Sequence, residues 1–295
     1  MKLKCENKSI RLRMDLSEKN SVLVTGSSRM GKTFFASNLA ADLIRKGNII
    51  HLIDLGEKWG RQDKSRLIAA GAVEKAVEQQ GLKLVFASAA ELSGCARRIL
   101  NALGFWSSGK EALLKRIFLQ QNNRSKGCLS IKDILNFLAK EDAENREEKD
   151  QAQEIYNCLD NFGNIPDITF SIDKGVQFSS LSTIWDLSEL DDTYVKISAY
   201  LIMYCLYCQK RREFKNSITQ KNVFVIIDEC QNLEFDRKSI VGICLAEGQK
   251  YRLNLILITQ FLSGNFPGTV LNQFRQGGFC FHFRATEEDA AVISR

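Results

Sequence analysis

Short apolar runs alternate with longer amphipathic stretches along most of the chain. The stretches at 34–45 and 193–214 carry apolar residues at helical spacing. Strands that alternate with helices in this way predict an α/β fold, in which helices flank a mainly parallel sheet. The runs that we interpret as buried strands cover residues 21–25, 48–54, 83–86, 182–187, 222–227, 253–259 and 278–284.

Between the strands at 83–86 and 182–187 the pattern becomes wholly helical. Helices are predicted at 91–103, 110–120, 131–139 and 151–162, and Ser130 is a suitable N-cap for the third of them. The charged run at 141–150 has no apolar period, so a solvated linker or helix face is the favoured interpretation. We therefore expect an all-helical insertion at 90–165 within a core formed by 1–89 and 166–295. The alternation at 10–14 predicts an edge strand that leads into the strand at 21–25. A further helix is predicted around 63–79, before the strand at 83–86.

Composition adds few constraints to this picture. A chain of 295 residues with 44% hydrophobic content can form one large α/β domain with an insertion. The net charge of +6 permits contact with nucleic acid but does not require it. The basic run at 210–215 closes a predicted helix, where cations are favoured in any case, so nucleic-acid contact there is the less favoured interpretation.

The cysteines and histidines look structural. Most of the nine cysteines are dispersed, and several fall in apolar segments. Cys205 and Cys208 form a single CxxC without a second pair or a nearby histidine, so buried reduced thiols are favoured over a metal site. His51 and His282 lie within predicted strands and are expected to be packed. Without a secretory signal pattern, and with its most apolar helix (197–207) too short for a bilayer, the chain is expected to be cytoplasmic.

One loop has a pattern that is typical of phosphate binding. Residues 26–33 read Gly-Ser-Ser-Arg-Met-Gly-Lys-Thr, directly after the strand at 21–25 and before the helix at 34–45. Strand, glycine-rich loop and helix are the context that a Walker A motif requires. Glycine lets the backbone pass close to phosphates, and the helix turns its N-terminal dipole towards the anion. We therefore predict that this loop binds ATP.

The residues of the loop have separate predicted roles. Lys32 brings a positive charge to the phosphates, and the Thr33 hydroxyl is placed to bind Mg²⁺. Arg29 stands where many such loops carry a further glycine. The residues predicted to contact the nucleotide are Gly26, Ser27, Ser28, Arg29, Met30, Gly31, Lys32, Thr33 and Phe34.

Polar side chains at the ends of other strands complete the predicted site. Asp228 and Glu229 follow the apolar run at 222–227, which is the Walker B pattern. Asp228 is predicted to hold Mg²⁺, and Glu229 to act as the general base that activates water. Gln260 ends the strand at 253–259 and can sense the γ-phosphate or the water. A further acidic residue near the water is expected from Asp54 or from Glu57.

Four segments in the same order resemble the HerA/FtsK superfamily of ring-forming ATPases. They are 53–57, 183–190, 228–233 (Asp-Glu-Cys-Gln-Asn-Leu) and 247–260, which ends in Thr-Gln. The superfamily includes conjugative coupling proteins and type IV secretion ATPases, and the resemblance covers about residues 15–290. It implies a RecA-like P-loop NTPase core, a homo-hexamer, Mg²⁺-dependent ATP hydrolysis and DNA as the client in most branches. A separate docking or nuclease subunit is a further candidate partner.

One departure from the superfamily pattern affects the expected activity. Gln249 stands where these ATPases commonly place an arginine finger, which is worth roughly 10³-fold or more in turnover. Lys250, Arg252, Arg275, Arg284 or a partner subunit are alternatives. A DNA-translocating motor is the leading hypothesis, an ATP-binding switch or assembly subunit with little hydrolysis is the second, and a secretion-type ATPase is the third. The loops at 58–61 and 263–265 are candidates for a pore, although ordinary surface loops are the favoured interpretation there.

Overall fold

The computed structural model divides the chain into two compact units. The first contains residues 1–74, 181–185 and 219–295, and the second contains residues 75–180 and 186–218. The residues that the structure describes are 2–5, 8–11, 21–55, 59–124, 128–140, 146–160, 167–173, 180–218, 221–260 and 268–284, together with Phe178, Leu262 and Asp289.

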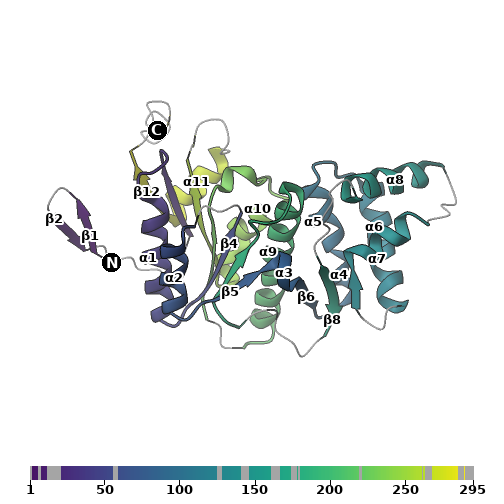
Figure 1. Ribbon diagram of the computed structural model, residues 1–295, viewed down its shortest axis with the longest axis horizontal. Helices are drawn as coiled ribbons and strands as arrows, with labels where there is room; N and C mark the ends of the chain where they lie inside the picture. Colours follow the sequence, from purple (N-terminus) through teal and green to yellow (C-terminus); the bar gives the residue numbers. More distant parts are fainter. Residues whose placement is uncertain are drawn as a thin grey trace. The chain divides into compact units, whose positions relative to one another are not determined.

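A seven-stranded sheet with the order β12-β3-β11-β10-β4-β9-β5 dominates the first unit (Figure 1). Strands β12, β3, β11, β10 and β4 pair in parallel with their neighbours in this series. This arrangement confirms the predicted α/β fold with a mainly parallel sheet. The strands are β3 (Ser21–Gly26), β4 (Ile49–Asp54), β5 (Val73–Ala76), β9 (Thr183–Asp186), β10 (Val223–Ile227), β11 (Leu253–Thr259) and β12 (Gly278–Phe283).

The register of the central strands brings the predicted site residues to one edge of the sheet. Ile227 at the end of β10 is level with Ile53 in β4, and Thr259 at the end of β11 is level with Thr25 in β3. Because these strands are parallel, the residues that follow them emerge at the same edge. Strand β11 lies between β3 and β10. Its last residues are therefore placed between the glycine-rich loop and the Walker B carboxylates.

A hydrophobic core on one face of this sheet holds the helix that follows the glycine-rich loop. Helices α1 (Lys32–Arg45) and α2 (Arg61–Ala69) supply its outer layer. Alternate residues of the strands, such as Val24, Ile226 and Ile258, pack with Phe35 and Leu39 of α1 and are at most 3% exposed. Burying a side chain of this size stabilises a fold by about 1.5–3 kcal/mol. The first turn of α1, which carries the phosphate-binding residues, is therefore anchored by its own core face.

Two further helices and two short 3₁₀ turns complete the first unit. Helix α10 (Ile240–Glu247) contacts β11, and α11 (Gly268–Gly277) contacts β3 and β12. Ser239 caps α10 by accepting a hydrogen bond from the Gly242 amide at 3.0 Å. The 3₁₀ turns are η1 (Cys230–Asn232), directly after the Walker B residues, and η2 (Gly248–Tyr251), which leads into β11.

The amino-terminal half differs from the sequence predictions in two places. Of the strand expected at 10–14, residues 10 and 11 belong to β2 (Lys8–Arg11), which pairs antiparallel with β1 (Lys2–Cys5) in a separate two-stranded sheet, and residues 12–14 lie outside the described residues. A single helix was expected near 63–79, but α2 ends before Gly71, whose φ of +111° reverses the chain, and β5 and α3 (Val77–Gln80) follow. Strand β5 is short and half exposed, so its apolar signal is weak.

The second unit is built on a three-stranded sheet with the order β6-β8-β7. Strands β6 (Leu82–Phe86) and β8 (Ile168–Ile172) are parallel, and β7 (Cys128–Ser130) is antiparallel to β8. The strand expected at 83–86 thus exists, but it belongs to this sheet and not to the main one. Ser130 caps α7 through a complete capping box with Asp133, as expected from its position.

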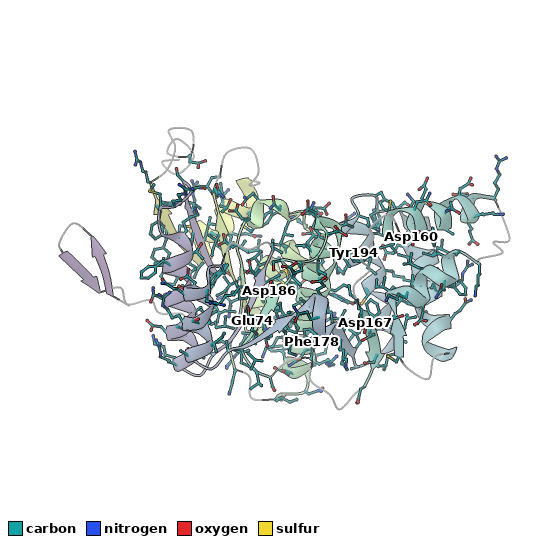
Figure 2. The ribbon with its side chains drawn as sticks, in the orientation of Figure 1. Glu74, Asp160, Asp167, Phe178, Asp186 and Tyr194 are labelled. Carbon is teal, nitrogen blue, oxygen red and sulfur yellow. The ribbon has the colours of Figure 1, made fainter. Side chains whose placement is uncertain are left out.

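Besides the short α3, the second unit contains helices that pack on this sheet and on one another, and the longest of them is α9. Helix α9 contacts α5 and β6, and Tyr194 lies near its start (Figure 2). The Tyr194 hydroxyl donates a 2.8 Å hydrogen bond to the Leu159 carbonyl of α8. The helices are α4 (Ala89–Ser93), α5 (Cys95–Ala102), α6 (Ser108–Arg124), α7 (Ile131–Leu138), α8 (Arg146–Asp160) and α9 (Asp192–Lys215). No helix in the described ranges is long and apolar enough to cross a membrane.

The helical insertion expected at 90–165 corresponds to part of the second unit. One short strand, β7, interrupts its helices. The sequence did not predict this strand, because a run of three residues between helical segments is too short to show a strand pattern. Contacts also group β6, β8 and α9 with these helices, whereas the sequence assigned them to the core. The functional boundary between core and insertion stays a prediction.

Candidate nucleotide-binding site

The loop between β3 and α1 contains two glycines that are required for different reasons. Gly26 has a φ of +137°, and a Cβ atom there would lie 1.6 Å from the Phe283 carbonyl oxygen of β12. No other residue fits at Gly26, because the clash is with backbone atoms of the neighbouring strand. Gly31 has a φ of +88° at the N-cap of α1, but a Cβ atom there would meet nothing within 4 Å. Its requirement is therefore conformational.

Arg29 occupies the position at which many such loops have a further glycine. Its φ is 62°, in the left-handed region, and its side chain is exposed. A non-glycine residue in this conformation costs about 1–3 kcal/mol. The loop thus keeps the backbone shape that glycine favours, and it accepts the strain of an arginine at this position.

Lys32 is the buried cation of the loop. Its side chain is 7% exposed, and its ammonium group donates a 2.9 Å hydrogen bond to the Ser27 carbonyl oxygen. Burial lowers the pKa of Lys32, while the carboxylates of Asp228 and Glu229 raise it. The Lys32 ammonium is therefore fixed to the backbone at the start of the loop, close enough to Asp228 and Glu229 to interact with their charges.

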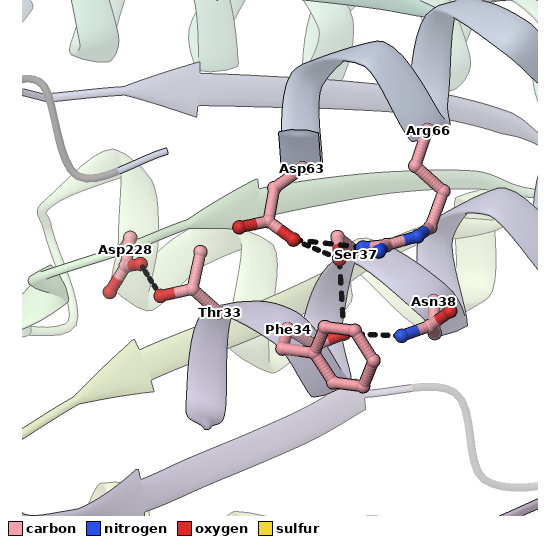
Figure 3. Close-up of polar contacts among 7 residues, drawn as sticks. All are labelled: Thr33, Phe34, Ser37, Asn38, Asp63, Arg66 and Asp228. Atoms are coloured by element: carbon pink, nitrogen blue, oxygen red, sulfur yellow. Dashed lines mark hydrogen bonds and ion pairs between the residues drawn. The ribbon is translucent and has the colours of Figure 1, made fainter. Parts of the chain in front are cut away.

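A hydrogen bond between Thr33 and Asp228 connects the Walker A loop to the Walker B residues. The Thr33 hydroxyl donates a hydrogen bond of 3.1 Å to Oδ2 of Asp228 (Figure 3). The Glu229 amide donates one of 2.9 Å to Oδ1. Burial raises the pKa of Asp228 to about 6, although both hydrogen bonds oppose this shift. A hydroxyl and a buried carboxylate are a suitable oxygen donor set for Mg²⁺.

Side-chain amides hold the carboxylate of Glu229. Gln260 donates to Oε1 of Glu229 at 2.5 Å, and Gln231 donates to Oε2. Oε1 of Gln231 accepts from the Thr259 hydroxyl at 2.8 Å. The backbone of Glu229 is left-handed, with a φ of 54°, and the residue is 8% exposed.

This network reaches the glycine-rich loop. The Ser28 hydroxyl donates a 2.7 Å hydrogen bond to Oε1 of Gln260, so Gln260 bridges the loop and the Walker B carboxylate. Sequence analysis named Ser28, Gln260 and Glu229 but missed Gln231. Its only signal was its place two residues after Glu229, which by itself does not show that the side chain turns back to the carboxylate.

Among the comparisons with known proteins, only the one with solved structures finds similar proteins. No family model and no curated protein sequence matches the chain. The structure resembles VirB4 of Thermoanaerobacter pseudethanolicus with a TM-score of 0.66 and 13% identity, covering 95% of this chain and 83% of that one. It resembles the bacterial conjugative coupling protein TrwBdeltaN70 with a TM-score of 0.57 and 14% identity, covering 94% and 73%.

A third similar structure is the plasmid coupling protein TrwB in complex with the ATP analogue ADPNP, at a TM-score of 0.51 and 14% identity, covering 88% and 69%. The chain therefore has the RecA-like P-loop fold that these structures share. At these identities the likeness establishes the fold, and the roles of individual site residues remain predictions.

A second polar cluster connects α2 to the first half of α1 (Figure 3). Asp63 of α2 accepts hydrogen bonds of 2.8 Å from Ser37 and from Arg66. The Arg66 guanidinium also lies 4.8 Å from the centre of the Phe34 ring, which is 59% exposed. Sequence analysis missed Ser37, Asp63 and Arg66, because only tertiary packing of α2 on α1 brings them together.

Asp54 does not take the role expected for it. The residue is fully buried at the end of β4, and its Oδ2 lies 3.0 Å from the Lys64 ammonium of α2. Its charge is therefore compensated within the protein rather than directed to a water molecule. The alternative residue, Glu57, lies outside the described residues, as do Lys58 and the loop 263–265. His51 is packed against Trp185, as expected, but His282 is exposed, with its Nδ1 at 2.7 Å from the Thr25 hydroxyl.

Gln249, Lys250 and Arg252 lie at the opposite end of β11 from the glycine-rich loop. Arg284 lies beside this loop, because its carbonyl oxygen accepts hydrogen bonds from the Ser27 amide at 3.3 Å and from the Ser27 hydroxyl at 3.1 Å. Gln249 and Lys250 are exposed in η2, and Arg252 directly precedes β11. The seven residues of β11 separate them from Gln260, which is about 20 Å at roughly 3.3 Å per residue. Arg275 on α11 and Arg284 after β12 are also exposed. Their identity as fingers remains a prediction.

Proposed function

We propose that the chain is an Mg²⁺-dependent ATPase motor of HerA/FtsK type that moves or processes DNA as a homo-hexamer. The observation that carries the proposal is the hydrogen-bonded path from Ser28 through Gln260 to Glu229, beside the contact of Thr33 with Asp228. This path connects the phosphate-binding loop to the carboxylate that would activate water. It is the connection that a hydrolytic site needs and that a passive phosphate-binding loop does not need.

The residues fit ATP and Mg²⁺ as follows. Lys32 and the N-terminus of α1 would hold the β- and γ-phosphates, since both place positive charge at the loop. Thr33 and Asp228 would hold Mg²⁺, which neutralises charge on the phosphate oxygens when it is bound. Burial disfavours the ionised form of Asp228, and a divalent cation would offset this cost.

Glu229 would act on the attacking water as general base. Both of its oxygens accept from side-chain amides, which fixes the orientation of the carboxylate. Gln260 also accepts from Ser28 of the loop, so its amide is placed to respond to a γ-phosphate. Hydrolysis would then depend on whether the loop, Gln260 and Glu229 are aligned at the same time.

The client and the assembly are the finer parts of the proposal. DNA as client is supported by the likeness to the conjugative coupling protein TrwBdeltaN70 and by the net charge of +6. Gln249 supports the second candidate, an ATP-binding switch subunit with little turnover, because the finger position lacks a cation. A secretion-type ATPase that acts on protein remains the third candidate.

The proposal is tested by ATP turnover of the purified chain with and without double-stranded DNA. We expect DNA to stimulate turnover, and we expect Glu229→Gln to lower kcat by about 10²–10³-fold because the base is lost. Glu234→Gln serves as a matched control, since it removes an exposed carboxylate five residues further along the chain. ATP binding with negligible turnover under all conditions would favour the switch, and turnover that ignores DNA would contradict the DNA motor.

A further inference from the structure

The second unit contains a pocket of about 260 Å³ beside the C-terminal half of α9. This volume is slightly smaller than the usual volumes of ligand pockets, which begin at about 300 Å³. It therefore suits one small molecule or one unit of a polymer. The lining residues that matter here are Tyr204, Tyr207, Arg211, Arg212 and Lys215 of α9, and Glu91 of α4.

The charges around the pocket are not balanced. Arg212 is paired with Glu91 at 2.5 Å, and the same oxygen of Glu91 accepts from the Ala87 amide. The side chains of Arg211 and Lys215 are exposed, and neither forms a hydrogen bond or ion pair with any residue that the structure describes. Two cations thus remain available at the rim of the pocket, while its carboxylate is already compensated.

The two cations at the rim of the pocket lie on the same face of α9. Arg211 and Lys215 are four residues apart on α9, so they share a face and are separated by about 6 Å along the helix axis. Cations near a helix C-terminus stabilise the helix by about 0.3–1 kcal/mol in any case. That effect alone does not explain why they border a hollow with aromatic walls.

The aromatic walls are held in place before any ligand arrives. Tyr204 and Tyr207 are 8% and 7% exposed. The Tyr204 hydroxyl donates a 3.0 Å hydrogen bond to the Glu91 carbonyl, and the Arg98 guanidinium lies 4.9 Å from the centre of its ring. A fixed apolar wall beside free cations suits a phosphate group that is attached to an organic ring.

We propose that this pocket binds a phosphate ester of nucleotide size, either as a free nucleotide or as one nucleotide of a single-stranded nucleic acid. Arg211 and Lys215 contact the phosphate, because an arginine fork and a lysine ammonium both suit phosphate oxygens. Tyr204 and Tyr207 contact the sugar or the base. The proposal does not rest on ATP hydrolysis, since its residues all belong to the second unit.

The test measures the binding of a fluorescein-labelled thymidine oligonucleotide of about 20 nucleotides. Binding is monitored by fluorescence anisotropy in the absence of ATP and Mg²⁺. The variant Arg211→Gln/Lys215→Gln is expected to bind about tenfold more weakly. Its slope of log K against log salt should fall by about 1.4, because two phosphate contacts of about 0.7 each are lost. The matched control is Lys132→Gln/Lys140→Gln, which removes two exposed cations from the same unit. We expect the control to keep its affinity within about threefold.

A second arm separates the two sources of the phosphate ester. Thymidine 5′-monophosphate and inorganic phosphate are titrated by calorimetry into the same three proteins, whose folding is checked by circular dichroism. Binding of the monophosphate without the oligonucleotide, weakened only in Arg211→Gln/Lys215→Gln, assigns the pocket to a free nucleotide. Equal losses in both double variants, or no binding of either probe by the wild-type chain, would overturn the proposal. Because ATP is absent, a chain that lacks ATPase activity can still pass this test.

Discussion

At the scale of single residues, the site is organised around carboxylates that the fold buries and then holds with specific partners. Asp228 contacts Thr33, and Glu229 contacts Gln231 and Gln260. Burial of charged groups reduces folding stability, so such positions are where stability and function oppose each other. The contacts of Asp228 and of Gln231 each lead to a prediction.

Asp228 should make the free protein less stable at neutral pH than at acidic pH. Its pKa in the folded state, about 6, exceeds the ordinary value of 3.8, so the folded protein binds more protons between these values. Stability is therefore lost as the pH rises from about 4 to about 6, and the loss stays complete above that range. A shift of this size corresponds to about 2–3 kcal/mol.

The measurement is urea unfolding of the wild type and of Asp228→Asn at pH 4 and pH 8, without nucleotide or Mg²⁺. We expect Asp228→Asn to raise the free energy of unfolding by about 2 kcal/mol at pH 8 and to change little at pH 4. A variant that is destabilised at pH 8 would show that the ionised carboxylate is well compensated in the fold.

Gln231 should act as a positioning residue for Glu229. Removing its side chain in Gln231→Ala takes away one donor to the carboxylate and the acceptor of Thr259. We expect kcat to fall about tenfold with the KM for ATP changed less than about twofold, because the amide orients the base and does not touch the phosphates.

Asn232→Ala is the matched control for this prediction, since Asn232 is the exposed neighbour in the same 3₁₀ turn. Equal losses of kcat in both variants would mean that the turn as a whole matters, rather than the amide of Gln231. An unchanged kcat in Gln231→Ala would remove Gln231 from the account.

At the scale of elements, the sequence predicted the central strands well and the peripheral ones poorly. Strands β10 and β11 are buried along their whole length, so their continuous apolar runs were unambiguous. Strand β5 lies at one end of the main sheet and has no buried residue, and β6 belongs to a different sheet although it carries an apolar run. Hydrophobic pattern reports burial, and it does not report which strand is the neighbour.

The same limit applies to the candidate site. The Walker residues were predictable because their spacing is local: the loop directly follows β3, and Asp228 directly follows β10. The Gln231 contact and the cluster of Ser37, Asp63 and Arg66 depend on how separate elements pack, which a single sequence does not state. The close approach of Phe283 to Gly26 is a further example, because it explains the glycine through a strand more than 250 residues away.

At the scale of the whole molecule, the account assigns different chemistry to the two units. The first unit carries the phosphate-binding loop and the carboxylates on one edge of its sheet. The second unit carries the pocket beside α9, which is lined by cations and by two tyrosines. The central claim is that the first unit binds Mg-ATP through its loop, since both the motor and the switch hypotheses require it.

The most direct test of that claim is equilibrium binding of Mg-ATP to the purified chain, measured by calorimetry beside Lys32→Ala. Arg45→Ala is the control, because Arg45 is an exposed cation at the far end of the same helix. The account predicts that the wild type and Arg45→Ala bind with the same affinity, and that Lys32→Ala binds at least about tenfold more weakly, because a charge-assisted contact to the phosphates is lost. No binding by the wild type, or equal binding by Lys32→Ala, would contradict it.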